Sequence, residues 1–183
     1  KVRKLFKTVK ESKQLSEKKR EEWFGIIQKA KKEGLIDFAV SFQSEKIIDS
    51  RGISWAIKKA LDCSLKKVCR NFIGLSLTLK RTFKGSIESR NDYFSNVRVL
   101  LDGGLKAPPQ YTNQKTIIRG DEKIQVIALA SICAKVLRDR RMIQLGKKYP
   151  KYGFEIHKGY GTKRHYGAIR KYGMVGEHRR SFL

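Results

Sequence analysis

Two aspartates follow short apolar runs and have the side chains best suited to binding a metal. Asp102 ends the run Val97–Leu101, and Asp121 lies just beyond Thr116–Ile118. Mg²⁺ prefers oxygen ligands and keeps several waters, so one or two carboxylates for each ion are enough. Each aspartate also has a structural interpretation, since Asp-Gly after a strand forms turns and Asp at a helix start caps it. Taken together, the pair predicts a shared site for a hard divalent cation.

A second candidate site is the segment HKGYGTKRH at residues 157–165. Its candidate contact residues are Lys158, Gly159, Tyr160, Lys163 and Arg164. The basic side chains can neutralise phosphates, the tyrosine ring can stack on a base or sugar, and glycine lets the backbone approach a ligand. The alternative is a basic loop around a core tyrosine. We favour a nucleic-acid interface because glycines, rather than apolar residues, flank Tyr160.

Three other polar residues are given structural roles. Asp139 lies in the charged run RDRR and is predicted to form ion pairs with the arginines around it. His157 and His178 are possible metal ligands. An isolated histidine in a basic loop is more often a surface group that makes hydrogen bonds, and we favour that interpretation for both.

The composition is that of a strongly basic globular protein. In 183 residues, 42 Lys and Arg against 17 Asp and Glu give a formal net charge of +25. This charge attracts polyanions. Every apolar run is short and interrupted by Lys or Arg, so we expect a nucleic-acid partner, no membrane association and a monomer. No C-x-x-C pair is present, which predicts reduced thiols, no zinc site and a cytoplasmic location for a chain with Cys63, Cys69 and Cys133.

Apolar periodicity predicts the helices that position these residues. The first lies between an N-cap at Ser16 and a stop at Gly34, and its buried stripe includes Trp23 and Ile27. The helix Ile124–Leu137 is apolar almost all round, which predicts a buried helix with its charged end in solvent. The other predicted helical segments are Ser44–Asp49, Ser54–Val68 and Lys163–Lys171.

A third predicted strand precedes the two that end near the aspartates. Leu35–Phe42 alternates apolar and polar residues, which is typical of a half-buried strand. Cys69–Asn96 has no clear pattern and is interpreted as an insertion or long loop with a possible short strand. Strands and helices together indicate an α/β fold. The best candidate for a domain boundary is near Tyr149, which gives residues 1–148 and a C-terminal extension, 149–183, that we regard as part of the same domain.

Most of this sequence resembles the type 2 ribonuclease H family, bacterial ribonuclease HII. The matching segments are KESKQLSEKKREEWF (10–24), VLLDGG (99–104), IIRGDEK (117–123), LASICAKVLRDRRM (129–142), YPKYGFEIHKGYGTKRH (149–165) and HRRSF (178–182). The combination of HKGYGT with AKV-x-RDR is highly specific to that family.

The resemblance implies an RNase H-like α/β fold, in which a mixed sheet is flanked by helices and followed by a C-terminal extension of helices and loops. It also implies endonucleolytic cleavage of RNA in RNA–DNA hybrids and at ribonucleotides embedded in duplex DNA. The implied cofactors are two Mg²⁺ or Mn²⁺ ions held by four acidic residues, of which Asp102 and Asp121 match the third and fourth. Tyr160 matches the tyrosine that packs at the RNA–DNA junction and senses the 2′-hydroxyl.

The N-terminal part departs from the family pattern. Ser12 and Lys13 match a D-S-K element near the substrate backbone, with Glu11 in place of the usual aspartate. The family's first strand carries D-E-A-G-R-G, which supplies two carboxylates and a loop that holds the hybrid, and this motif is not in the sequence. We therefore expect the first two strands to be missing and the polypeptide to be inactive or nearly so. The alternative is a non-catalytic, basic nucleic-acid-binding protein, which the composition alone favours.

Overall fold

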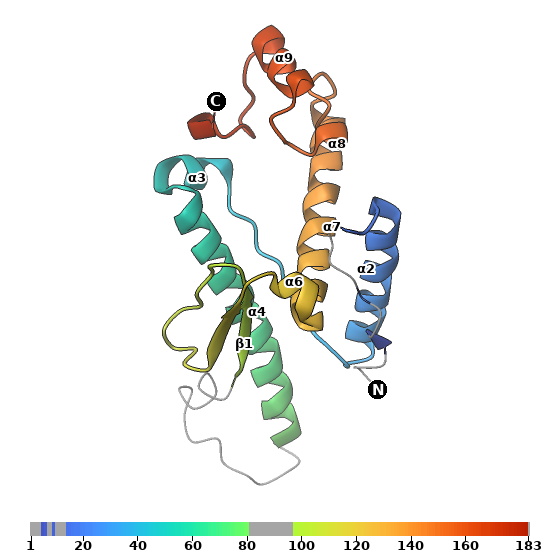
Figure 1. Ribbon diagram of the computed structural model, residues 1–183, viewed down its shortest axis with the longest axis vertical. Helices are drawn as coiled ribbons and strands as arrows, with labels where there is room; N and C mark the ends of the chain where they lie inside the picture. The colour runs from blue at the N-terminus through green and yellow to red at the C-terminus, as the bar shows by residue number, and fades with distance from the viewer. Residues whose placement is uncertain (1–4, 7–8, 10–13, 81–96, 183) are drawn as a thin grey trace.

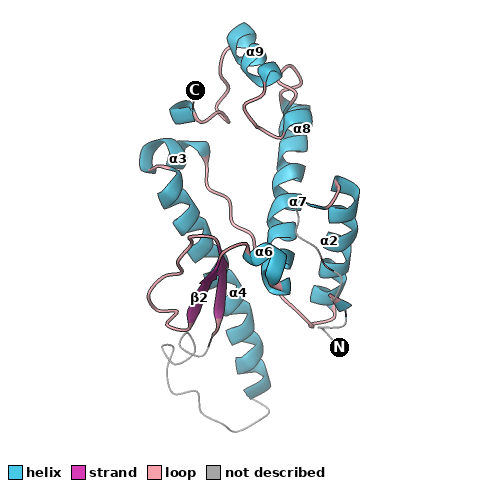
Figure 2. Cartoon of the chain, viewed as in Figure 1, coloured by secondary structure: helices cyan, strands magenta, loops and turns pink. Residues whose placement is uncertain are grey.

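The computed structural model describes residues 5–6, 9, 14–80 and 97–182, without the side chains of residues 72–80. Ser12 and Lys13, two predicted contact residues, lie outside this part. The described elements are α2 (Glu17–Lys32), α3 (Glu45–Arg51), α4 (Ile53–Lys80), β1 (Val99–Asp102), β2 (Gln114–Ile117), α6 (Gly120–Lys123), α7 (Gln125–Lys148), α8 (Phe154–His157), α9 (Lys163–Tyr172) and the 3-10 turn η2 (Arg180–Phe182). The described part is mostly helical, with one small sheet (Figures 1 and 2).

Helix α7 joins the parts of the fold. It contacts α2 along its side, α6 and β1 near its N-terminal end, and α8 at its C-terminal end (Figure 1). Its apolar residues Ile132, Cys133 and Val136 pack against Phe24 and Ile27 of α2. The predicted buried helix is therefore confirmed, and it runs to Lys148 rather than ending at Leu137.

The N-cap predicted at Ser16 is confirmed, and the structure adds a second cap at Ser44, the first residue of the predicted segment Ser44–Asp49. Ser16 Oγ accepts a hydrogen bond from the Lys19 amide at 3.2 Å, and Ser44 Oγ accepts one from the Ile47 amide at 3.4 Å. These oxygens satisfy amide groups that have no partner within the first turn of a helix. Beyond α2 the chain reverses at Gly34, whose φ of +69° favours glycine.

The two strands that lead to the aspartates are present and parallel. Their register pairs Val99 with Gln114 and Asp102 with Ile117. Parallel pairing brings the carboxyl ends of both strands to the same edge of the sheet, where α6 follows β2. Inward residues of β1 pack with Cys69 of α4 and the fully buried Tyr111 in a second core cluster.

Two predictions of local structure are wrong. Leu35–Phe42 is extended, but it pairs with no strand among the described residues. Ile36, Phe38 and Val40 pack instead, partly buried, against the core between α2 and α7, while Phe42 at the end of the segment is exposed. The helix predicted for Ser54–Val68 continues as α4 to Lys80, so the first part of the proposed insertion at Cys69–Asn96 is helical. The mixed sheet expected from the sequence is represented in the described residues by two parallel strands.

Residues of the C-terminal segment 149–182 form a small cluster on the end of α7. Tyr152 and Phe154 stack with ring centroids 5.6 Å apart and pack against Leu145 of α7. Further along the chain, Asp49 of α3 accepts hydrogen bonds from the amides of Arg180 and Ser181 at 2.9 and 3.0 Å. No described helix is long and apolar enough to cross a membrane.

Candidate metal centre and nucleic-acid interface

Asp102, the last residue of β1, is held at the start of α6. Its Oδ1 atom accepts a hydrogen bond from the Gly120 amide at 2.7 Å. Gly120 follows Arg119, a non-glycine residue with a φ of 55°, and this left-handed turn directs the chain from β2 into α6. The hydrogen bond therefore fixes the half-buried carboxylate beside the residue that precedes Asp121.

A larger residue at Gly120 would require the end of the Ile127 side chain to move. A Cβ atom there would lie 2.7 Å from Ile127 Cδ1 and 3.4 Å from Asp102 Oδ1. Asp121 itself is 6% exposed, so its carboxylate belongs to the protein interior and not to the bulk solvent. Backbone and packing together bring the two predicted aspartates to adjoining elements at one edge of the sheet.

The two aspartates fit part of a site for a hard cation. Carboxylate oxygens are the ligands that Mg²⁺ and Mn²⁺ prefer, and Mg²⁺ completes its octahedral coordination with water and substrate phosphate. In the residues that the structure covers, no group of three or more His, Cys, Asp or Glu gathers to hold a metal. Asp102 and Asp121 are carboxylates of the type that these ions prefer and lie on adjoining elements, β1 and α6.

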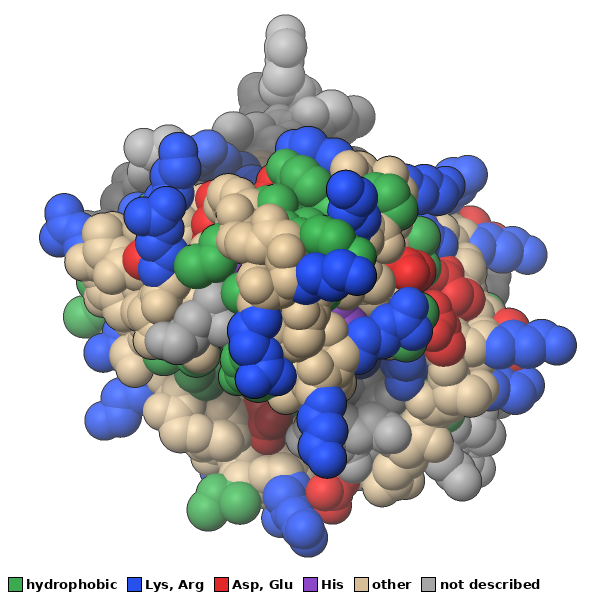
Figure 3. Space-filling model, turned by 90° about the horizontal axis from the view of Figure 1, so that it is seen from above, with side chains coloured by type: hydrophobic (Ala, Val, Ile, Leu, Met, Phe, Trp, Pro, Cys, Tyr) green, Lys and Arg blue, Asp and Glu red, His purple; other side chains and the backbone are tan. Residues whose placement is uncertain are grey.

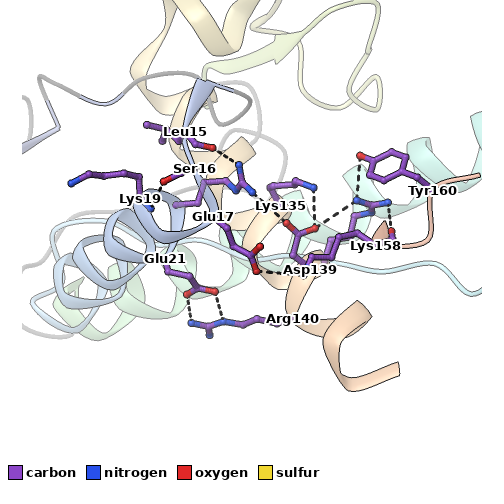
Figure 4. Close-up of polar contacts among 12 residues, drawn as sticks. Leu15, Ser16, Glu17, Lys19, Glu21, Lys135, Asp139, Arg140, Lys158 and Tyr160 are labelled. Carbon is purple, nitrogen blue, oxygen red and sulfur yellow. Dashed lines mark hydrogen bonds and ion pairs between the residues drawn. The ribbon is translucent and has the colours of Figure 1, made fainter. Parts of the chain in front are cut away.

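Tyr160 lies on the surface, 58% exposed, and not in the core. The Arg138 guanidinium covers one face of its ring at 4.7 Å from the centroid. The same guanidinium donates to the Tyr160 hydroxyl at 3.4 Å and to the Lys158 carbonyl at 2.9 Å (Figure 4). The tyrosine is therefore fixed by a cation on one side, and the ring remains accessible to a base or sugar.

Asp139 organises the cations around this tyrosine. It is 4% exposed and lies 2.9 Å from the Lys135 ammonium, with the guanidinium groups of Arg20 and Arg138 both at 3.7 Å. The predicted ion pairs with arginine are thus confirmed, and Lys135 is added to them (Figure 4). A buried carboxylate is stable only when paired, so these contacts compensate its desolvation.

The structure brings Lys135 and Arg138 to Tyr160, although neither was among the predicted contact residues. Both lie on α7, one turn apart, and their distance in sequence from the tyrosine concealed the contact. The AKV-x-RDR pattern contained both residues and was the signal that could have identified them. Lys158, which was predicted to contact phosphate, lies 3.4 Å from Glu17 and its side chain is 13% exposed.

Lys163 and Arg164 are exposed at the start of α9. Thr162 caps this helix by accepting a hydrogen bond from the His165 amide at 3.2 Å. Lys and Arg side chains project on all sides of the face seen from the α9 end (Figure 3). Residues 158–162, between α8 and α9, form the loop that carries Tyr160, here called the Tyr160 loop. A cavity of about 470 Å³ beside this loop is lined by Arg138 and Gly159 among others. This surface has the sign of charge that attracts phosphate backbones.

The histidines are not surface groups, so that prediction is wrong. His157, His165 and His178 are 7%, 7% and 6% exposed. Burial lowers the pKa of His165 and of His178 from the ordinary value of 6.5. Single histidines spread over 22 positions give no periodic signal, and only the packing of the C-terminal cluster brings their rings together.

Comparison with known proteins identifies the family. A family model described as Ribonuclease HII matches residues 79–183. Ribonuclease HII of Endomicrobium trichonymphae is 40% identical over 172 residues, which cover 94% of this chain and 69% of that protein. The chain belongs to the ribonuclease HII family. Membership implies an RNase H-like fold, and the family generally uses a divalent metal.

Other members of the ribonuclease HII family match at the same level. The protein of Clostridioides difficile (strain 630) is 40% identical over 179 residues, covering 96% of this chain and 57% of that protein. That of Bacillus thuringiensis (strain Al Hakam) is 40% identical over 173 residues, covering 94% and 55%. The chain spans between about half and two thirds of the length of these relatives.

Proposed function

We propose that this protein is an endoribonuclease of RNA–DNA hybrids and of duplex DNA with embedded ribonucleotides. Asp102 and Asp121 would hold the divalent metal, Mg²⁺ or Mn²⁺, on which cleavage depends. The observation that carries the proposal is the Gly120–Asp102 hydrogen bond of 2.7 Å, which joins a strand end to the helix that bears Asp121. Membership in the ribonuclease HII family supports the choice of substrate.

The spacing of the two sites along α7 suits a nucleic-acid strand. Gln125 begins α7 next to α6, and Lys135, beside Tyr160, lies ten residues further along. At about 1.5 Å for each helical residue, the aspartate end and the tyrosine end are separated by about 15 Å along the axis. A duplex that rises about 3.4 Å for each base pair covers that distance in four to five pairs.

We assign the residues of this chain roles in metal binding and in substrate contact. When bound, the metal supplies an activated water and stabilises charge on the phosphate oxygens. Asp102 and Asp121 provide its oxygen ligands, and the Gly120 amide fixes the orientation of the first. Arg138, with Lys135, offers positive charge near the substrate backbone, while Tyr160 packs against the sugar at the junction between RNA and DNA. Lys158, Gly159, Lys163 and Arg164 are the further residues that we propose contact the nucleic acid near this junction.

Two carboxylates balance little of the charge of two divalent ions. We therefore expect the 183-residue polypeptide to bind Mn²⁺ weakly and to cleave a hybrid slowly or not at all. The alternative function, a basic protein that binds nucleic acid without cleaving it, is favoured by one observation, the net charge of +25. Both functions predict salt-dependent binding to any duplex, and they differ in metal binding and in recognition of a ribonucleotide.

Asp102→Asn separates these functions. Electron paramagnetic resonance of Mn²⁺ measures the affinity of the polypeptide for the ion, and we expect the substitution to lower it at least about tenfold, because a charged ligand becomes neutral. Glu33→Gln, which removes an exposed carboxylate at the end of α2, is the matched control and leaves the affinity unchanged. Equal Mn²⁺ affinity in both variants would show that Asp102 is not a ligand of the metal.

The second measurement concerns the substrate. Binding to a duplex with one ribonucleotide is compared with binding to the same duplex made of DNA alone, over a range of salt concentrations. We expect tighter binding to the first duplex with the same salt slope for both. Equal affinity at every salt concentration would favour the non-catalytic binding protein, and rapid Mn²⁺-dependent cleavage at catalytic protein concentrations would overturn the expected low activity.

A further inference from the structure

Three buried histidines come together from separate segments behind the Tyr160 loop. His157 ends α8, His165 lies in α9, and His178 lies between α9 and η2. The rings of His157 and His165 stack with centroids 4.2 Å apart, and those of His165 and His178 are 5.2 Å apart. None of the three has a part in the proposed chemistry, yet burying three imidazoles has a cost unless their nitrogens are satisfied.

The hydrogen bonds of His157 determine where its proton lies. The Gly159 amide donates to its Nδ1 atom at 3.2 Å, so that nitrogen carries a lone pair. The proton of the neutral ring is then on Nε2, which donates to the Tyr152 carbonyl at 2.8 Å. His157 thus holds the backbone on the N-terminal side of Tyr160.

The same reasoning gives His178 and His165 opposite tautomers. The Val175 amide donates to His178 Nδ1 at 2.9 Å, nearer than the Val175 carbonyl at 3.2 Å, so the proton of His178 is on Nε2. That Nε2–H donates to His165 Nε2 at 3.1 Å, which makes this nitrogen an acceptor. His165 therefore carries its proton on Nδ1 and donates to the Tyr160 carbonyl at 3.0 Å.

The loop held by these bonds has an uncommon backbone. Lys158 and Gly159 have φ values of 50° and 78°, both in the left-handed region. A non-glycine residue there costs free energy and persists only where its surroundings hold it. The Gly159 amide, the Lys158 carbonyl and the Tyr160 carbonyl are each bound, to His157, Arg138 and His165 respectively.

We propose that His157, His165 and His178 are positioning residues for Tyr160, and that a directed chain of hydrogen bonds from Val175 through His178 and His165 fixes its carbonyl. The proposal deepens the proposed function, on which it rests, because it makes recognition of the RNA–DNA junction depend on the C-terminal segment. That segment is itself tied to α3 through Asp49, which accepts the amides of Arg180 and Ser181.

The electrostatics of the cluster agree with this chain. A directed chain requires neutral rings, since a second proton on His165 would face the Nε2–H of His178. Desolvation lowers the pKa of both His165 and His178 from the ordinary value of 6.5. Burial therefore favours the neutral form of these two rings, in which each acts once as donor and once as acceptor.

The first test reads the tautomers in the 183-residue polypeptide without nucleic acid. Two-bond ¹H–¹⁵N correlation spectra of the imidazole rings distinguish a proton on Nδ1 from one on Nε2. We expect His165 to carry its proton on Nδ1, and His157 and His178 to carry theirs on Nε2. A spectrum in which His165 has its proton on Nε2, or in which the rings are charged at pH 7.5, would overturn the proposal.

The second test uses two isosteric substitutions at one position. In His178→Gln the side-chain amide replaces Nε2–H and can still donate to His165, whereas in His178→Asn it replaces Nδ1 and cannot reach it. Both remove the imidazole ring, and they differ from each other by one methylene group and by the position of the amide. We expect the signals of the Tyr160 ring and amide to stay in place with Gln and to shift or broaden with Asn. The same change in both variants would show that the ring acts by packing alone.

The third test measures the binding of two duplexes, because a purely structural role of His178 would not change the preference for one duplex over the other. The preference for a duplex with one ribonucleotide over all-DNA duplex should fall about tenfold in His178→Asn, the factor that corresponds to about 1.4 kcal/mol, and should stay within about twofold of the original in His178→Gln. If the unaltered protein has no such preference, the proposed function fails, while the tautomers and the Tyr160 signals still decide whether the histidines position the loop.

Discussion

The two ends of α7 hold their candidate functional residues by different means. At the N-terminal end, the one hydrogen bond described for the Asp102 carboxylate comes from the Gly120 amide at 2.7 Å. At the far end, the Tyr160 loop is held by Arg138 and by two histidines, and it stands on an aromatic cluster built from Tyr152 and Phe154. A backbone amide therefore orients the Asp102 carboxylate, whereas a network of side chains holds the Tyr160 loop.

This difference indicates which of the two sites has its binding geometry complete before a ligand arrives. A metal site with two protein carboxylates takes the rest of its ligands from water and substrate, so its geometry is completed only when these arrive. A rigid aromatic site needs no further ligand before it binds. We therefore expect the tyrosine end to bind nucleic acid in a defined geometry, and the aspartate end to respond to small changes around Gly120.

The largest expected effect comes from overfilling the tyrosine end with Gly146→Ala. The new Cβ atom would overlap Glu155 Oε2 and lie 3.0 Å from the Glu155 backbone nitrogen, so α7 and α8 must separate. We expect a loss of about 1–3 kcal/mol in the free energy of unfolding, measured by urea denaturation. Gly167→Ala in α9, where nothing lies within 4 Å, is the control and should stabilise slightly. Equal stability of the two variants would contradict the tight packing at Gly146.

Gly120→Ala tests the aspartate end in the same way, with a different outcome. Its Cβ atom would lie 2.7 Å from the flexible end of Ile127 and touch Asp102 Oδ1 at 3.4 Å, so a shift of Gly120 that relieves the first contact would move the amide that holds the carboxylate. Because a side-chain end can move, we expect a smaller loss of stability than at Gly146, but about a tenfold loss of Mn²⁺ affinity as the carboxylate is displaced. Mn²⁺ titration checks this. Unchanged affinity would mean that the Gly120 contact does not orient the ligand.

A smaller effect is expected from Arg138→Lys, which keeps the charge and removes the planar group. Lysine cannot cover the Tyr160 ring while also donating to its hydroxyl and to the Lys158 carbonyl. Salt dependence of binding should be retained, since the number of charges is unchanged, whereas the preference for a ribonucleotide-containing duplex should fall several-fold. Fluorescence anisotropy of the two duplexes measures both quantities. A loss confined to the salt slope would assign Arg138 to the phosphate backbone alone.

The smallest effect is a pH dependence located at the tyrosine end. His165 and His178 have lowered pKa values in the folded chain because they are buried, so the unfolded chain binds protons more readily. The stability they contribute is complete above about pH 6.5 and is lost as the pH falls below it. Thermal unfolding between pH 7.5 and pH 5 measures this, above the range in which Asp37 and Asp49 titrate. His178→Gln should reduce the dependence of the unfolding temperature on pH. An equal dependence in the variant and the original protein would show that His178 does not contribute to it.

Much of the local structure followed from the sequence. Ser16 was recognisable as a cap because its oxygen accepts from an amide only three residues away. The apolar run of α7, the two strands before the aspartates and the helix after Thr162 were also predicted, since each depends on a short periodic pattern. The side chain of Tyr160 was expected on the surface because glycines flank it, and its exposure confirms that.

What only the tertiary structure decided depends on contacts between distant residues. The alternation of Leu35–Phe42 predicted a strand, but apolar side chains at alternate positions can also pack on a helical core, as Ile36, Phe38 and Val40 do here, while Phe42 is exposed. The histidines, 8 and 13 positions apart in the chain, became a buried network because α8, α9 and the C-terminal segment pack together. Residue types and local spacing thus determined the candidate chemistry, the charge and most helices. The hydrogen bonds of Gly120 with Asp102 and of Arg138 with Tyr160 join residues 18 and 22 positions apart, which no local pattern encodes.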